Sequence, residues 1–323
     1  MGMRTSAFLL SAVTLAASLV SAGVRAQTLD TFKVAIGAPG NWDTCVPEVG
    51  KRAGIFRKHG IEIESLFTNG GGETMQAVIS GSIDIGIAAG TAAALGAYSK
   101  GAPVRIISAG TTGTGDLFWY VPADSPIKTF KDTAGKTIGF STNGASTHTT
   151  LLALIDTFKV AAKPVSTGAS AVTLTQAMSG QIDVGWASPP FGIDALQQGK
   201  IRLIARGSDA PSTADQTVRV HIANADVLAK RGPAVQRFMD AYREALDYLY
   251  ADPKGIEIYA DYAKIDVALA KRIREEFMPK AAMNPDKVSG IDAITRDAIT
   301  FKVMSAPLTP AQLADAIQIP PRH

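Results

Sequence analysis

The 323-residue sequence carries 32 Lys and Arg against 29 Asp and Glu, and no basic tract stands out. Nucleic-acid binding depends on clustered Lys and Arg that neutralise phosphates, so we expect no nucleic-acid partner. Cys45 is the only cysteine, which excludes a disulfide within the chain. The length exceeds that of most single hydrophobic cores and favours two domains.

Residues 1–26 have the pattern of a cleaved signal peptide. Arg4 makes a basic start, and the run from Ala7 to Val20 is almost wholly apolar but shorter than the roughly 20 residues of a membrane-spanning helix. Small side chains precede a cut after Ala26 in the order that signal peptidase prefers. No cysteine sits at the cleavage site to carry a lipid. We therefore predict export to the periplasm as an unanchored protein.

Short apolar runs alternate with helical stretches from Thr31 onward. Residues 32–36 and 61–67 are typical of strands, and 47–59 are typical of a helix that ends at Gly60. The glycine cluster at 70–72 opens another helix. Strand, helix and strand in this rhythm predict an α/β fold, with a mostly parallel sheet that helices cover on both faces.

An internal repeat is the most informative feature. Residues 76–86 and 176–185 both begin Gln-Ala, pass through Gly-x-Ile-Asp and end at Gly. Chance similarity remains an alternative, because Gly-x-Ile-Asp is a natural exit from a helix into a strand. The shared Gln-Ala, together with a matched glycine and strand downstream of each copy, favours two related lobes, since the spacing of about 100 residues is too long for a solenoid repeat.

We expect the chain to cross twice between these lobes. The first lobe would comprise 27–120 and 208–323, and the second lobe 121–207. Pro233 suits the first turn of a helix. Six apolar residues at helical spacing after it form one face that should pack on the first lobe: Val235, Phe238, Met239, Tyr242, Leu246 and Leu249.

Small polar loops follow many of the predicted strands. Ligands of open α/β sheets settle at the carboxyl ends of strands, and free N–H groups at helix starts suit an anionic head group. Each such residue is also an ordinary helix cap, and Trp186 is also a candidate core residue. The candidate ligand-binding residues are Asn41, Trp42, Gly71, Gly72, Thr74, Gly90, Thr91, Thr112, Asn143, Gly144, Ser146, Thr147, Trp186 and Ser188.

Motifs of catalysis are missing from the sequence. It has no glycine-rich dinucleotide or phosphate loop, no His-Glu-x-x-His and no Gly-x-Ser-x-Gly. The four histidines, His59, His148, His221 and His323, are widely scattered, and no Cys/His cluster suggests zinc. We therefore predict no catalytic residues, no metal and no cofactor.

The chain resembles the solute-binding proteins of ABC importers for nitrate, sulfonate and taurine, the NMT1/THI5-like family. The resemblance covers about Phe32 to Arg206. It rests on six stretches: Val49 to Phe56, His59 to Ile61, the two Gly-x-Ile-Asp copies, Pro122 to Ile127 and Asp132 to Gly139. It implies a type II periplasmic binding protein with two hinged lobes. The binding positions that it implies are Asn41 to Asp43, Gly70 to Thr74, Ala89 to Thr91, Asn143 to Thr147 and Trp186 to Pro189.

We expect a monomer that captures a small organic anion, such as a sulfonate, a taurine-like compound or a carboxylate, because helix starts suit an anionic head group. It would deliver this ligand to an ABC permease and its ATPase. A neutral thiamine-pyrimidine-like ligand is the alternative within the binding class. A related enzyme branch makes the thiamine pyrimidine with pyridoxal phosphate, a reactive His and a Cys-rich motif. Cys45 is the only cysteine here, which counts against that enzyme.

Overall fold

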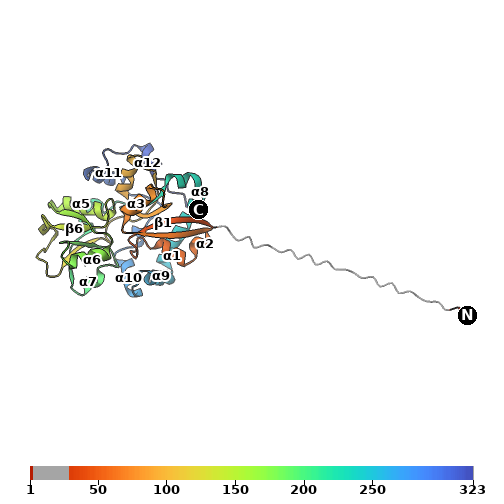
Figure 1. Cartoon of the computed structure of the whole chain (residues 1–323), viewed down its shortest axis with the longest axis horizontal. Coiled ribbons are helices and arrows are strands. Elements are labelled where there is room, and N and C mark those ends of the chain that lie inside the picture. Colours follow the sequence, from red (N-terminus) through yellow and green to blue (C-terminus); the bar gives the residue numbers. More distant parts are fainter. Residues whose placement is uncertain (3–28, 323) are drawn as a thin grey trace.

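The computed structural model describes residues 1–2 and 29–322. From β1 (Asp30–Gly37) onward, these residues form two mixed β-sheets, each covered by helices (Figure 1). The α/β fold of the type II binding proteins is therefore confirmed. The predicted signal peptide lies outside the described residues, apart from Met1 and Gly2. Among the described residues, no helix is both long and apolar enough to cross a membrane.

The first sheet has the order β2 (Ile61–Thr68), β1 (Asp30–Gly37), β3 (Ile85–Gly90), β10 (Arg219–Asn224), β4 (Val104–Ala109). β1 pairs in parallel with β2 and β3, whereas β10 runs antiparallel to both β3 and β4. Every residue of β3 and β10 is buried, as expected for central strands with helices on both faces.

The second sheet combines β8 (Gly185–Ala187), β5 (Phe118–Pro122) and β9 (Ile201–Arg206) with the parallel pair β6 (Thr137–Phe140) and β7 (Lys163–Ser166). A bridge from Ile138 to Val184 joins β6 to the start of β8. The order β7–β6–β8–β5–β9 thus repeats that of the first sheet. In both sheets the antiparallel strand, β5 or β10, is the first strand after the chain passes over from the other sheet.

The repeated aspartates have the same structural task in the two sheets. Asp84 accepts a hydrogen bond from the backbone N–H of Lys33 in β1, and Asp183 accepts one from the backbone N–H of Thr137 in β6. Each carboxylate therefore ties the turn before a central strand to its neighbouring strand. This shared role explains the Gly-x-Ile-Asp repeat without any contact to ligand.

The chain passes between the sheets twice. β5 belongs to the second sheet, so the first crossing precedes Phe118, whereas the sequence placed it at residue 120, inside this strand. The second crossing runs from the end of β9 at Arg206 to the start of β10 at Arg219, and the boundary expected at 208 lies within it. We call the first sheet with its helices the first lobe, and the second sheet with its helices the second lobe.

Helices α8 to α10 follow the second crossing, and α8 and α9 pack on the first lobe. All six apolar residues predicted on one face of α8 are buried in the first core. α8 is kinked at Arg231, where the backbone is not helical, so Pro233 opens the longer second part. The helices are α1 (Val46–Arg52), α2 (Ile55–Lys58), α3 (Gly71–Ile79), α4 (Thr91–Ser99), α5 (Ser146–Phe158), α6 (Ser170–Met178), α7 (Ile193–Gln197), α8 (Ala225–Ala251), α9 (Pro253–Ala263), α10 (Val267–Glu276), α11 (Ile291–Thr300) and α12 (Pro310–Ala316).

Candidate functional site

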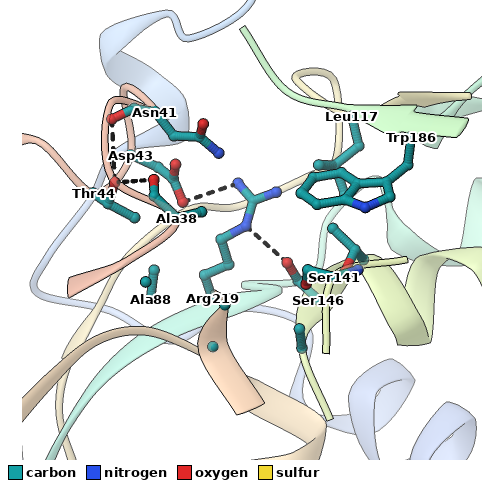
Figure 2. Close-up of a pocket in the computed structure, with 15 residues that line it drawn as sticks. Ala38, Asn41, Asp43, Thr44, Ala88, Leu117, Ser141, Ser146, Trp186 and Arg219 are labelled. Carbon is teal, nitrogen blue, oxygen red and sulfur yellow. Dashed lines mark hydrogen bonds and ion pairs between the residues drawn. The ribbon is translucent and has the colours of Figure 1, made fainter. Parts of the chain in front are cut away.

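A small cavity lies where the two lobes meet, beside the strands that follow the crossings (Figure 2). It has a water-accessible volume of about 30 Å³, enough for about two or three water molecules. The first lobe lines it with Gly37, Ala38, Asn41, Asp43, Thr44, Gly70, Gly71, Ala88 and Arg219, and the second lobe with Leu117, Ser141, Ala145, Ser146, Thr147 and Trp186.

Arg219, the first residue of β10, occupies the centre of this cavity wall and is only 4 % exposed. Its Nη1 lies 2.9 Å from Asp116 Oδ2 and 3.4 Å from Asp43 Oδ2. Its Nε donates a hydrogen bond of 2.8 Å to Ser146 Oγ at the start of α5. Burial lowers the pKa of Arg219, but Asp116 and Asp43 outweigh it and keep the pKa above its ordinary value. The guanidinium is therefore a permanent positive charge that both lobes contact.

The two carboxylates beside Arg219 are held differently. Asp116 accepts a hydrogen bond of 2.8 Å from Ser188 Oγ in addition to its contact with Arg219. Burial raises the pKa of Asp43 to about 6; Arg219 opposes this rise and Asp116 adds to it. Asp43 thus carries a charge that its surroundings stabilise poorly. A group with an N–H donor or a positive charge, placed in the cavity, would stabilise it.

Two buried oxygen atoms at the site have no hydrogen-bond partner among the described residues: Asn41 Oδ1 and Asp116 Oδ1. The Asn41 side chain is 5 % exposed and lines the cavity, and in Figure 2 it points toward the guanidinium. Buried polar atoms are normally paired. An unpaired acceptor facing a cavity therefore suggests that a bound molecule supplies the missing donor.

His221, two residues after Arg219 on β10, supports the floor of the cavity. Its Nδ1 accepts a hydrogen bond from the backbone N–H of Ala88, so its Nε2 donates to Tyr242 Oη on α8 at 2.7 Å. Ala88 lines the cavity and has a φ of 61°, a left-handed conformation that is unfavourable for alanine. The hydrogen bond that the Ala88 N–H donates to His221 stabilises this conformation.

Glycines allow the lobes to approach at backbone distance. A Cβ atom on Gly72 would lie 2.0 Å from the carbonyl oxygen of Asn143, and one on Gly90 would lie 2.2 Å from that of Gly144. The N–H of Gly72 donates to Thr142 Oγ1 of the second lobe at 3.0 Å. We call this contact of Gly72 and Gly90 with residues 142–144 the glycine clasp.

The candidate residues from the sequence fall into three places. Five line the cavity: Asn41, Gly71, Ser146, Thr147 and Trp186. Four form the glycine clasp beside it: Gly72, Gly90, Asn143 and Gly144. The other five lie behind these groups: Trp42, Thr74, Thr91, Thr112 and Ser188, of which Ser188 touches the site through Asp116.

Trp42 is the clearest difference between expectation and structure. The sequence offered it as a wall for the ligand, but it is 1 % exposed in the first core and packs against Tyr259. Its Nε1 donates to Tyr250 Oη at 2.9 Å. Thr91 and Thr112 bond to Thr217, and Thr74 bonds to Thr68. Their polar side chains complete loops inside the first lobe.

Arg219, Asp116 and the role of Asp43 are what sequence reasoning missed. Asp43 was part of a proposed binding loop, but it was not singled out. An arginine within the apolar run from Val218 to Ile222 is an unusual residue for a buried central strand. This signal could have identified Arg219, since a buried charge needs a specific partner or ligand.

Comparisons with known proteins agree with this architecture. The family model described as NMT1/THI5 like matches residues 48–256. A Brucella abortus protein described provisionally as a binding protein is 26% identical over 288 residues, covering 83% of this chain and 85% of the relative. The 4-amino-5-hydroxymethyl-2-methylpyrimidine phosphate synthase of Uromyces fabae is 22% identical over 237 residues, covering 68% of this chain and 67% of the relative.

Solved structures of binding proteins share the fold. The alkanesulfonate-binding protein SsuA from Xanthomonas axonopodis pv. citri, bound to MOPS, has a TM-score of 0.74 at 21% identity, covering 89% of this chain and 97% of that chain. Among the described residues, no group of three or more His, Cys, Asp or Glu side chains could hold a metal ion. The matched family model covers more than half of the sequence and the lobes have the predicted topology, so the chain belongs to the NMT1/THI5-like family.

Proposed function

We propose that this protein is the periplasmic substrate-binding component of an ABC importer, and that it closes its two lobes around a small polar solute. The observation that carries the proposal is the buried Arg219, which both lobes contact inside an interlobe cavity. Closure would follow the usual logic of hinged binding proteins, in which a ligand that contacts both lobes favours the closed state.

The pattern of residues 1–26 supports export, and the likeness to SsuA supports a role in transport. We propose that the closed form docks on a permease driven by an ATPase, and that the protein acts as a monomer. The solute would carry a carboxylate or sulfonate. Arg219 would contact this group, together with the start of α5, where Ser146 and Thr147 line the cavity.

An enzyme of the pyrimidine-synthase type is the rival from another class, and one relative bears that name. The described residues that line the cavity include two charged side chains, Asp43 and Arg219, and no His, Lys or Cys. Cys45 is buried in the first core, where burial raises its pKa well above the ordinary value and keeps the thiol protonated. Binding without chemical change is therefore the function that we propose.

The test is a titration of the mature protein, refolded to remove any bound ligand, with sulfonates, carboxylates, nitrate and thiamine pyrimidines. Trp186 lines the cavity, so its fluorescence should change on binding. Saturable binding with recovery of the compound unchanged is the expected result. Chemical conversion of any compound would overturn the proposal, as would the absence of binding across the panel by a folded protein.

Asn41→Ala tests whether this cavity is the binding site. The Oδ1 atom of Asn41 has no partner among the described residues, so its removal should leave the fold intact. It should weaken the affinity for the bound compound by about threefold to tenfold, the effect of one hydrogen bond. Asn284→Ala, at an exposed position outside the cavity, is the matched control. Equal affinities of the two variants would place the site elsewhere.

A further inference from the structure

The cavity has two chemically different sides. The loop after β1 presents acceptors, the carboxylate of Asp43 and Asn41 Oδ1. The opposite side presents donors, namely Arg219 and the start of α5 with the hydroxyls of Ser141 and Ser146. Figure 2 shows Asn41 and Asp43 on one side of the guanidinium and the two serines on the other. A ligand that fits both sides needs a donor at one end and an acceptor at the other.

The charge balance points the same way. Arg219 contributes one positive charge, and Asp43 and Asp116 contribute two negative charges within 3.4 Å of it. The cluster is therefore net negative before any ligand enters. A simple anion would add a further negative charge to a buried site, which is costly. A solute that brings its own positive charge to Asp43 avoids this cost.

We propose, on the basis of the solute-binding function above, that the cavity selects a zwitterionic solute. Its ammonium group contacts Asp43 and Asn41, and its carboxylate or sulfonate contacts Arg219 and the start of α5. Asp43 lines the cavity, whereas Asp116 is not among the lining residues and holds Arg219 and Ser188 through its Oδ2 atom, so Asp43 is the carboxylate that the ligand can reach.

Matched pairs of compounds that differ only in the amino group test this proposal by calorimetry. The pairs are taurine with ethanesulfonate, 3-aminopropanesulfonate with propanesulfonate, β-alanine with propionate, and γ-aminobutyrate with butyrate. Because a charge-assisted hydrogen bond in a buried site is strong, the preferred amino compound should bind at least about tenfold more tightly than its partner. Equal or tighter binding of the compound without the amino group would overturn the inference.

Asp43→Asn tests which residue reads the amino group. Burial disfavours the charge of Asp43, so a neutral amide of the same shape should be tolerated by the fold. The variant should lose the preference for the amino compound by about tenfold, with little change for its partner. Asp194→Asn, at an exposed position on α7, is the matched control and should behave as the unmodified protein. An unchanged preference in a folded Asp43→Asn variant would overturn the assignment.

The two proposals fail in different ways. If no amino compound binds while another solute of the fluorescence panel does, the zwitterion inference is wrong and the binding function stands. If nothing in either panel binds to the folded protein, both are wrong. The comparison within pairs uses the unmodified protein, so it remains decisive even where Asp43→Asn does not fold.

Discussion

Arg219 and His221 are alternate residues of β10 and therefore lie on the same face of the strand. Both side chains are buried, but one is charged and the other is neutral. Arg219 keeps its charge because Asp116 and Asp43 stand beside it. His221 has no such partner, so burial lowers its pKa to about 3 and it remains neutral, with one ring nitrogen accepting and the other donating. One face of one strand thus supplies both a charge and a neutral support.

The low pKa of His221 predicts a specific dependence of stability on pH. The unfolded chain binds a proton at His221 near pH 6.5, whereas the folded protein does so only near pH 3. The contribution of this residue is therefore complete above about pH 6.5 and decreases as the pH falls toward 3. His221→Asn should lose about 1–3 kcal/mol of unfolding free energy at pH 7, because Tyr242 loses its partner.

Urea unfolding of the protein and of His221→Asn at pH 7 and pH 4.5 measures this effect. The variant should lose less stability than the unmodified protein between the two values, since it has no histidine to protonate at this site. His59→Asn replaces a partly buried histidine outside the cavity that pairs with Glu244, and it controls for the loss of any histidine. An identical decrease with pH in the protein and His221→Asn would contradict the assignment.

At the scale of elements, helix α3 begins with glycines and strand β3 ends in one for a reason that neither element reveals by itself. Gly72 lies in the first turn of α3, and Gly90 ends β3. Glycine is a poor helix and strand residue. Its lack of a Cβ is needed here because the loop between β6 and α5 approaches with its carbonyl groups.

Gly72→Ala should hold the lobes apart without unfolding them. The added methyl group would lie 2.0 Å from the carbonyl oxygen of Asn143, a distance that backbone atoms cannot accommodate, while alanine favours the helix itself. The affinity for solute should fall by at least about tenfold, because closure becomes costly. The radius of gyration from X-ray scattering should be larger than that of the unmodified protein. Gly232→Ala, in open space, should change neither quantity, and an unchanged radius and affinity for Gly72→Ala would refute this role.

At the scale of the whole molecule, chain crossings and apolar contacts connect the two lobes in addition to the glycine clasp. The two crossings lead directly into β5 and β10, the antiparallel strands of the two sheets. Leu269 and Phe277 of the C-terminal region pack against the core around Phe118, and Phe301 packs against the core around Leu151. Unfolding one lobe would therefore expose apolar surface of the other and strip Arg219 of its partners.

We accordingly expect one cooperative unfolding transition for both lobes. Trp42 lies in the first core and Trp119 in the second. Two variants, one retaining only Trp42 and one only Trp119, with phenylalanine at the other tryptophans, report on each lobe by fluorescence. Without ligand, the urea midpoint from fluorescence should equal the midpoint from circular dichroism in each variant. Midpoints that differ within the same variant between fluorescence and circular dichroism would show that the lobes unfold independently.

The sequence predicted the fold well because its signals are local. The Gly-x-Ile-Asp copies, the apolar face of α8 and the loops after strands all follow from short-range patterns. The same patterns brought Asn41, Gly71, Ser146, Thr147 and Trp186 to the cavity wall. Trp42 lies in the core instead. A tryptophan in a loop after a strand is compatible with a core or with a binding site, and here its contacts with Tyr250 and Tyr259, which are distant in sequence, place it in the core.

By itself, the sequence determined the α/β class, the internal duplication and the family, because these depend on periodicity and on motifs within a few residues. Only the tertiary structure decided the chemistry of the cavity. The cluster consists of Asp43, Asp116 and Arg219, which lie at least 73 residues apart along the chain. They meet only because the chain crosses between the lobes twice. Charge balance in a buried site is a property of that meeting, so no single stretch of sequence encodes it.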